Sequence, residues 1–240
     1  MALLQSTKEA LLQVGTSTIT GALNRRGFRN MFLQNVHPLR ITQAHLVGIA
    51  FTMRFIPSRE DKNGPNAPSR GQVQMEAMEQ CPPGGVLIID SRGDARAASA
   101  GDLYVGRLKA RGCAGIVTDG GLRDSEGILR TGLPAYCQRA SSPPSPIVHH
   151  PVDLNLAIAC GGVAVYPGDV VVGDCDGVVV IPADIADAVA EETLATTLYD
   201  EFAEAEVARG RPLPGLFPVA GPEAKRDFEA WKSARAKRPS

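Results

Sequence analysis

The chain has 240 residues, and its 25 Lys and Arg residues nearly balance 26 Asp and Glu residues, which gives a formal net charge of −1 at pH 7. A net charge so close to zero gives no electrostatic field that would attract a polyanion, so we expect no nucleic-acid partner. No apolar run reaches the roughly 18 residues that span a bilayer, so we expect no membrane span. The first ten residues lack the basic and apolar regions of a secretory signal, so we expect a cytoplasmic protein. The length predicts one sizeable domain, or a domain with an appendage. The end of a long helical pattern near residue 208 and the proline-rich stretch after it divide the chain into a main domain over residues 1–208 and a C-terminal extension over residues 209–240.

The first half of the chain predicts helices followed by alternating strands and helices. The first forty residues have a helical pattern, with residues 16–18 as candidate caps of a second helix, and the charged, proline-rich stretch 57–71 predicts an exposed loop. Apolar runs and helical spacing predict a strand at 44–55, a helix at 72–80, a buried strand at 86–90, a helix at 99–111 and a buried strand at 115–119. The last three elements form a βαβ unit.

The second half is richer in strands. Short apolar runs separated by turn residues predict strands at 146–148, 162–166, 170–172 and 178–181. A long helix is then predicted to begin with Asp184 as its N-cap and to end at Gly210. The last thirty residues are rich in proline and basic residues, and we expect an extended arm that packs on a neighbouring subunit or frays.

The densest group of chemically capable residues lies at one end of the βαβ unit. Residues 101–104 begin the middle helix, where first-turn amides are unsatisfied donors that attract an anion. Arg123, just after the following strand, adds a forked donor for the same anion. Asp102 and Asp124 supply two hard oxygen ligands, which suit Mg2+ or Mn2+. The sequence therefore predicts an anion pocket beside a divalent-metal site.

Plain structural roles are the alternative for these residues. Asp102 can cap a helix, and Arg123 with Asp124 can form a surface turn. The pair His149 and His150 is a weaker metal candidate, because neighbouring residues on a strand point to opposite faces. We expect both histidines to be solvated at a strand edge.

The segment 101–126 (GDLYVGRLKARGCAGIVTDGGLRDSE) resembles the motif of the RraA-like family, which contains 4-hydroxy-4-methyl-2-oxoglutarate aldolase and the regulator of ribonuclease E activity A. In that family a Gly-Asp/Glu helix start precedes an Arg-Asp pair one strand later. The resemblance continues through residues 161–182 and more loosely through 16–39, and it covers about residues 16–208. The tail from Pro212 is similar to a longer-tailed branch of the family.

The family resemblance implies an α/β fold, a swivelling β/β/α layered domain with N-terminal helices, a long C-terminal helix and an extended tail. It also implies assembly as a homotrimer or a homohexamer. The implied substrate-binding residues are Gly101, Asp102, Leu103, Tyr104 and Arg123. The amides of Leu103 and Tyr104 would hold the carboxylate of a 2-keto acid, and Arg123 would bind the same substrate.

The resemblance assigns the metal to the two aspartates. Asp124 would hold Mg2+ or Mn2+ directly or through water, and Asp102 would act through water. Family members also borrow a glutamate from the C-terminal helix of a neighbouring subunit, for which Glu201 and Glu204 are both candidates. Gly21 departs from the family pattern, which often has an acid in the early helix, and this difference leaves the substrate open.

The implied activity is that of a carbon-carbon lyase. A metal-dependent class II pyruvate aldolase would cleave a 4-hydroxy-2-keto acid of the 4-hydroxy-4-methyl-2-oxoglutarate type, and it would decarboxylate oxaloacetate because both reactions produce the same enolate. Arg123, Asp102 and Asp124 would be the catalytic residues. The alternative is a non-catalytic protein that binds and inhibits an RNA-degrading enzyme. We favour the enzyme, since a pure binding protein has no need for those three side chains together.

Overall fold

A computed structural model describes residues 3–42, 45–63 and 72–236 of the chain. Its helices are α1 (Gln5–Leu11), α2 (Thr16–Arg25), α3 (Glu60–Asn63), α4 (Gln72–Gln80), α5 (Asp102–Ala110), α6 (Ser125–Thr131), α7 (Ala186–Ala208) and α8 (Pro222–Ala236), with 3-10 helices η1 (Ser145–Ile147) and η2 (Ala183–Ile185). Its strands are β1 (His37–Pro38), β2 (Leu46–Pro57), β3 (Gly85–Asp90), β4 (Ala98–Ala100), β5 (Gly115–Thr118), β6 (Gly121–Leu122), β7 (Ala135–Cys137), β8 (Arg139–Ala140), β9 (His149–Leu154), β10 (Ile158–Cys160), β11 (Val163–Val165), β12 (Val170–Gly173) and β13 (Val178–Ile181).

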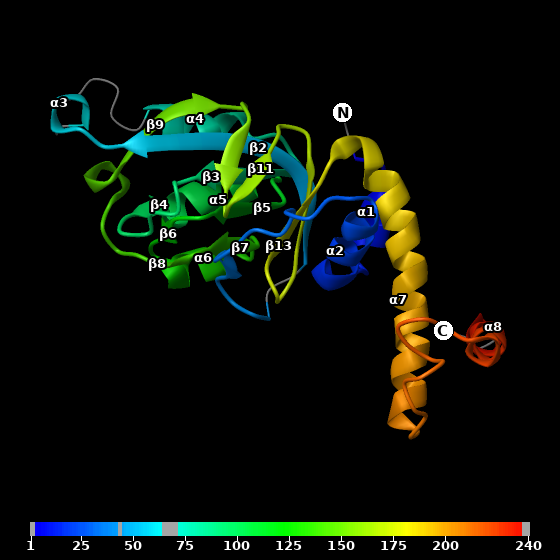
Figure 1. Ribbon diagram of the computed structural model, residues 1–240. Helices are drawn as coiled ribbons and strands as arrows, with labels where there is room; N and C mark the ends of the chain where they lie inside the picture. The colour runs from blue at the N-terminus through cyan, green and yellow to red at the C-terminus, as the bar shows by residue number, and fades with distance from the viewer. Residues whose placement is uncertain (1–2, 43–44, 64–71, 237–240) are drawn as a thin grey trace.

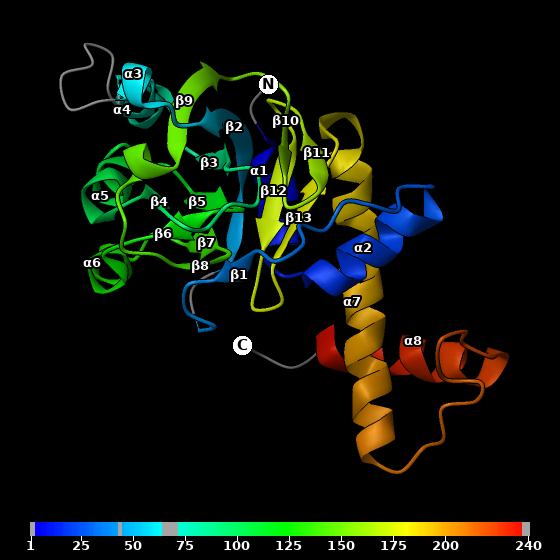
Figure 2. The same cartoon turned by 60° about the vertical axis from the view of Figure 1, so that its left-hand side comes forward.

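The main sheet has the strand order β1-β7-β5-β3-β2-β12-β13, and β9 also pairs with β2. Strands β7, β5, β3 and β2 are parallel, as the predicted βαβ unit requires, whereas β12 and β9 run antiparallel to β2. The apolar runs of β3 and β5 are buried along their whole length, which is typical of parallel strands covered on both faces. The long strand β2 joins the parallel and antiparallel halves (Figures 1 and 2).

The layers follow from what covers each face of this sheet. Helices α4, α5 and α6 pack on one face around buried residues such as Met53 and Leu87. The β10–β11 hairpin covers the other face against Ile88 and Val117. Helices α1, α2 and α7 close the end of the sheet formed by β12 and β13. The result is the α/β, β/β/α layered fold expected from the sequence.

Several predicted boundaries were wrong for local reasons. The strand predicted at 146–148 is the 3-10 helix η1, because Pro144 and Pro146 have no N–H to give to a ladder, and the strand begins at His149. The helix predicted from residue 99 begins at Asp102, because Ala98–Ala100 forms β4 beside β6. The N-terminal helical pattern ends at Arg25.

Two predicted helix caps were also wrong. The N-cap of α2 is Gly15, and the carboxylate of Asp174 takes the place of a local cap by accepting from the Thr16 amide at 2.7 Å and from Thr16 Oγ1 at 3.0 Å. Asp184 lies in η2, and Ile185 precedes the first residue of α7. A tertiary contact and an extra 3-10 turn explain the differences, and neither leaves a pattern in the sequence.

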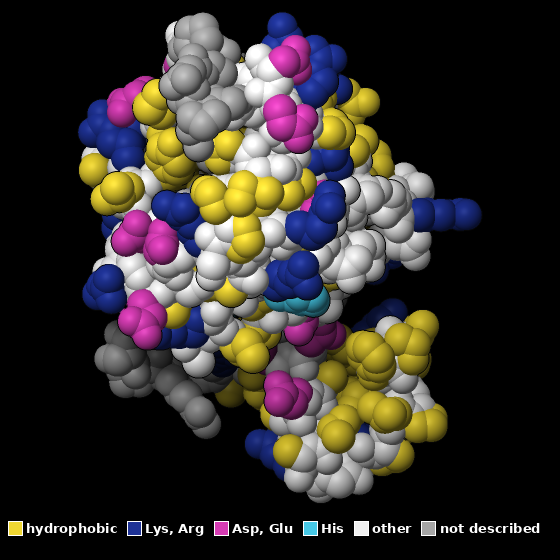
Figure 3. Space-filling model, turned by 90° about the vertical axis from the view of Figure 1, so that its left-hand side faces the viewer, with side chains coloured by type: hydrophobic (Ala, Val, Ile, Leu, Met, Phe, Trp, Pro, Cys, Tyr) yellow, Lys and Arg dark blue, Asp and Glu magenta, His cyan; other side chains and the backbone are white. Residues whose placement is uncertain are grey.

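The N-terminal part of α7 packs on α1 and α2, and the C-terminal part of α7 projects from the layered body with α8 as an arm (Figures 1 and 2). The predicted tail therefore contains a helix, α8, which packs on α7 through Phe202, Leu216, Phe228 and Trp231. Hydrophobic side chains gather on the lower lobe in Figure 3, which this arm forms. In the segment between α7 and α8, Leu213, Phe217 and Val219 are exposed. No helix in the described part of the chain is long and apolar enough to cross a membrane.

Candidate functional site

A cavity of about 400 Å3 lies where the start of α5, the loop between β6 and α6, and η1 meet. It brings together all the site residues that the sequence predicted within one subunit: Gly101, Asp102, Leu103, Tyr104, Arg123 and Asp124. These residues come from two segments of the βαβ unit that β4 and β6 hold side by side. The expected clustering at one end of this unit is therefore present in the structure.

Gly101 is the N-cap of α5, and its role is to leave space. Its backbone is extended, with φ −124° and ψ −176°, so any residue could adopt this conformation. A Cβ atom at this position would, however, come 2.7 Å from Asp124 Oδ2 and 3.2 Å from Arg123 Nε. The absence of a side chain at Gly101 is what allows the Arg-Asp pair to lie against the helix start.

Arg123 and Asp124 form a partly exposed pair at this cavity. Arg123 Nε donates to Asp124 Oδ2 at 3.1 Å, and the two side chains are 44% and 46% exposed. Asp124 has left-handed backbone angles, φ 57° and ψ 42°, which are uncommon for a residue with a side chain and recur at functional sites. The Arg123 amide donates to Ala100 O at 3.1 Å, which ties the pair to β4.

Asp102 lies against α6. A Cβ atom on Gly127 of that helix would come 2.4 Å from Asp102 Oδ2, so the carboxylate occupies the space that this glycine leaves. Asp102 follows the N-cap of α5, and Asp124 is the N-cap of α6, yet neither helix start has a side-chain capping hydrogen bond. The structure therefore does not support helix capping as the reason for either carboxylate.

The first turn of α5 presents backbone donors to the cavity. The first helical hydrogen bond runs from the Val105 amide to Gly101 O at 3.1 Å, so the amides of Leu103 and Tyr104 have no acceptor within the helix. The Leu103 side chain is 85% exposed, whereas Tyr104 packs against the core. This geometry suits binding of a carboxylate at the helix start.

The two glutamates expected from a C-terminal helix do not line this cavity within one chain. Glu201 lies on α7 in the projecting arm, where it forms an ion pair with Arg235 of α8. Glu204 is exposed on the same helix. Their contribution from a neighbouring subunit stays a prediction.

Sequence reasoning missed the part of the cavity that comes from other elements. Gln74 of α4 and Ser145 of η1 line it, together with Ala98, Ala100, Pro144 and Pro146. The Gln74 side-chain amide donates to Ser99 O, and Ser145 Oγ is buried without a hydrogen-bond partner among the described residues. These positions lie far from the motif in sequence, so no local pattern could have identified them.

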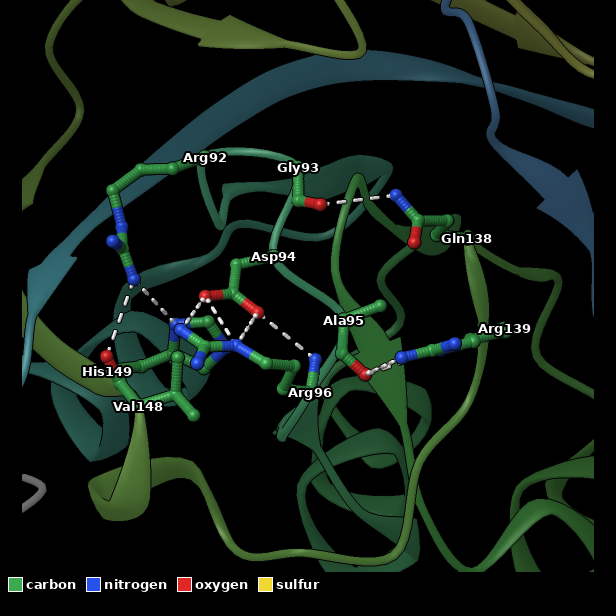
Figure 4. A network of polar contacts seen from close by, with 9 residues as sticks. All are labelled: Arg92, Gly93, Asp94, Ala95, Arg96, Gln138, Arg139, Val148 and His149. Atoms are coloured by element: carbon green, nitrogen blue, oxygen red, sulfur yellow. Dashed lines mark hydrogen bonds and ion pairs between the residues drawn. The ribbon is translucent and has the colours of Figure 1, made fainter.

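His149 was also misjudged, since the expected solvation at a strand edge is wrong for this residue. It is 1% exposed and stacks on Phe55 with ring centroids 4.9 Å apart. Arg92 points toward it and places Nη2 3.2 Å from both His149 Nδ1 and Val148 O (Figure 4). Burial lowers the pKa of His149, so the ring is held neutral. The pair His149 and Arg92 anchors the segment that follows η1.

A second acidic group lies in the turn between β12 and β13. In the described part of the chain, Asp174, Cys175 and Asp176 bring three potential metal ligands within 4.8 Å of one another. Asp174, however, already accepts from Thr16 and from the Asp176 amide at 2.9 Å. These contacts give the turn a structural role in holding α2.

The layered fold and the Gly-Asp and Arg-Asp segments at one cavity define an RraA-like protein. A family model, RraA-like (Aldolase/RraA), matches residues 16–180, and the chain belongs to this family.

Several curated relatives carry an enzyme name, and two of them illustrate the likeness. A Halalkalibacterium halodurans protein named as a candidate 4-hydroxy-4-methyl-2-oxoglutarate aldolase is 36% identical over 137 residues, 56% of this chain and 63% of that protein. A Pseudomonas aeruginosa protein with the same name is 35% identical over 107 residues, 45% of this chain and 65% of that protein. The chain thus spans less than two thirds of the length of either relative.

Solved structures extend the likeness to most of the chain. Streptomyces coelicolor RraAS2, described as an unusual member of the RNase ES inhibitor RraA protein family, is 29% identical with a TM-score of 0.75, over 85% of this chain and 98% of that one. An uncharacterized protein from Pseudomonas syringae has a TM-score of 0.79 at 21% identity, over 90% and 94% of the two chains, and shares the fold.

Proposed function

We propose that this chain is a divalent-metal-dependent pyruvate aldolase that cleaves a 4-hydroxy-2-keto acid and also decarboxylates oxaloacetate. The observation that carries the proposal is the meeting of Asp102, Arg123 and Asp124 at one cavity, with neither carboxylate used as a helix cap. The names of the curated relatives support the same reaction class.

The residues present fit a hard divalent cation. Gly101 and Gly127 leave the space that the carboxylates of Asp124 and Asp102 fill, and carboxylate oxygens are the ligands that Mg2+ and Mn2+ prefer. Asp124 would hold the ion, and Asp102 would act through water. The ion would supply Lewis-acid chemistry, which draws electron density from the C2 carbonyl of a keto acid.

Arg123 and the α5 helix start bind the substrate in this proposal. The guanidinium of Arg123 and the amides of Leu103 and Tyr104 would hold the C1 carboxylate and orient the keto acid. The same donors compensate the negative charge of the enolate that forms as the bond between C3 and C4 breaks. Asp124 keeps Arg123 in place through the 3.1 Å contact with Nε.

We also propose that the site is completed in a homo-oligomer, a trimer or a hexamer. Glu201 and Glu204 lie on the α7–α8 arm, which projects away from the body of its own subunit (Figure 2). Exposed apolar side chains on this arm, Leu213 and Phe217, favour contact with another subunit. In this arrangement residues 1–208 form the catalytic domain and residues 209–240 an extension that contacts a neighbour.

A non-catalytic regulator is the second candidate. The 29% identity to RraAS2 over 85% of this chain favours it, since that protein is described within an RNase ES inhibitor family. Such a protein would bind an RNA-degrading enzyme and would not depend on a metal at Asp124.

The decisive experiment measures pyruvate release from oxaloacetate and from 4-hydroxy-4-methyl-2-oxoglutarate, with Mg2+, with Mn2+ and with chelator. The native chain is compared with Asp124→Asn and with the control Asp176→Asn, which alters the acidic turn between β12 and β13. We expect turnover that is lost on chelation and in Asp124→Asn but kept in Asp176→Asn. Absence of release with every metal would favour the regulator.

A further inference from the structure

Two cysteine thiols contact each other between the C-terminal ends of two helices that border the cavity. Cys81 follows the last residue of α4, and Cys113 follows the turn that ends α5. The Cys113 Sγ atom lies 3.5 Å from Cys81 O and 3.6 Å from Pro82 O, and the two thiols hydrogen-bond to each other. Helices α4 and α5 pack side by side (Figure 2), and their other ends supply Gln74 and Gly101 to the cavity. A bond between the thiols would therefore tie together two helices of the candidate site.

The surroundings make Cys113 the more acidic of the two thiols. The hydrogen bond from Cys81 and the positive charge of Arg111 lower the pKa of Cys113, although burial opposes them. The same hydrogen bond, together with burial, raises the pKa of Cys81. Arg111 is held beside the pair, because its Nε donates to Cys81 O at 3.3 Å. Since the thiolate is the reactive form of cysteine, Cys113 is the nucleophile of the pair.

The other cysteines have different surroundings. Burial raises the pKa of Cys137 to about 11 and raises the pKa of Cys160 well above its ordinary value. Cys175 is exposed in the turn between β12 and β13. Cys113 keeps 6% of its surface exposed, whereas Cys81 is fully buried, so a small oxidant that arrives from solvent meets Cys113 first.

We infer that Cys81 and Cys113 form a redox modification site, which hydrogen peroxide converts to a disulfide between α4 and α5. The Cys113 sulfur attacks one oxygen of the peroxide and the O–O bond breaks, which leaves a sulfenic acid; the hydroxide released takes up the thiol proton and becomes water. The Cys81 sulfur then attacks the Cys113 sulfur and displaces hydroxide, which leaves as a second water with the Cys81 proton. Two electrons pass from the sulfurs to the peroxide, so two thiols and one peroxide give one disulfide and two waters. The inference does not depend on the proposed lyase activity.

The disulfide would hold the end of α4 more firmly than the contacts of the reduced chain. There, Glu79 of α4 pairs with Arg107 at 2.7 Å and with Arg111 at 3.6 Å, but these side chains are partly exposed, and such ion pairs contribute little. A disulfide instead restricts the unfolded chain between residues 81 and 113. We therefore expect the oxidised chain to melt at a temperature higher by about 5 °C or more.

The experiment uses the full chain with the substitution Cys175→Ser, which removes the exposed thiol and prevents bonds between chains. Hydrogen peroxide is added to the reduced, folded protein, and the melting temperature is measured before and after dithiothreitol. We expect a mass lower by two hydrogen atoms, a peptide that links Cys81 to Cys113, and a rise in melting temperature that dithiothreitol reverses. Cys137→Ser, at a buried cysteine of the same hydrophobic cluster, is the matched control and should still form the disulfide.

Single variants test which sulfur reacts first. In Cys81→Ser, peroxide should leave a sulfenic acid on Cys113 that dimedone labels, whereas Cys113→Ser should give no label at Cys81. If either variant fails to fold, the chain with both cysteines still decides, because the linked peptide and the melting temperature need neither substitution. Absence of the linked peptide in the folded chain, its formation only in urea, or a lower melting temperature after oxidation would overturn the inference. Labelling of Cys81 in Cys113→Ser would overturn the assignment of the nucleophile.

Discussion

Gly101 and Asp124 are in contact: a Cβ atom on residue 101 would come 2.7 Å from Asp124 Oδ2, closer than real Cβ contacts. Gly101→Ala should therefore displace Asp124 and the adjoining Arg123 from the cavity. Because misplacement of catalytic groups by about 1 Å can cost about 100-fold in rate, we expect kcat/KM for pyruvate release to fall by about that factor. Steady-state kinetics with saturating Mg2+ measures the loss.

Gly106→Ala is the control for that substitution. Gly106 lies in the same helix, and a Cβ atom there would meet nothing within 4 Å. Alanine in the interior of a helix stabilises by about 1 kcal/mol relative to glycine, so this variant should unfold at higher urea and keep full activity. Equal activity losses in both variants would show that rigidity of α5, and not the space at Gly101, matters.

Asp124→Asn should abolish divalent-metal binding without unfolding the protein. Asparagine tolerates the left-handed backbone of this position, and the side chain is 46% exposed, so we expect the free energy of unfolding to change by less than about 1 kcal/mol. Titration calorimetry with Mn2+ and urea unfolding of the same sample report the two properties separately. A large loss of stability with metal binding retained would make Asp124 a structural residue.

The strands and helices that the sequence predicted correctly are those whose own residues determine their secondary structure. The βαβ unit and the C-terminal helix were predicted from the uninterrupted apolar runs of β3 and β5 and from the helical spacing of apolar residues in α7. A strand buried on both faces, or a helix buried along one stripe, has a recognisable order of apolar residues in its own sequence. Short elements such as β8 and β10 were missed, since two or three residues acquire their state from a partner strand.

The candidate site likewise contains some residues that the local sequence identified and others that it did not. Asp102 and Arg123 were found because they lie in one motif whose spacing follows from a helix and a strand. Ser145 and His149 were missed or misjudged because their surroundings come from segments far along the chain, as with the Phe55 ring that stacks on His149. Burial of a polar side chain is a tertiary property, and local sequence does not record it.

The buried His149 should make stability depend on pH. Burial lowers its folded-state pKa below the ordinary value of 6.5. As the pH falls below about 6.5, the unfolded state gains a proton that the folded state does not, so the free energy of unfolding should fall, by at most about 1.4 kcal/mol per pH unit from this group. At higher pH both states are neutral and the contribution is constant. Urea unfolding at pH 7.5 and 6.0 measures the slope.

His149→Gln should flatten that slope, because glutamine does not titrate. The neighbouring His150→Gln is the matched control: its ring is partly exposed and contacts Asn63, and the variant should retain the native decline. An unchanged slope in His149→Gln would mean that other groups cause the pH dependence.

The N-terminal part of α7 packs on the layered body through Val189 and Ala190, whereas the C-terminal part of α7 and α8 should unfold separately from that body. The apolar cluster of this arm, with Leu216 fully buried beside Phe202, shares no buried residue with the clusters that cover the main sheet. Leu216→Ala should cost about 2–5 kcal/mol of local stability, as for other buried leucines, and should release α8. Hydrogen exchange is the measurement: amides of α8 should exchange faster while those of β3 and β5 keep their protection. Val219→Ala, at a residue 78% exposed in the same segment, should leave both unchanged. Faster exchange in β3 as well would show that the arm and the body form one cooperative unit.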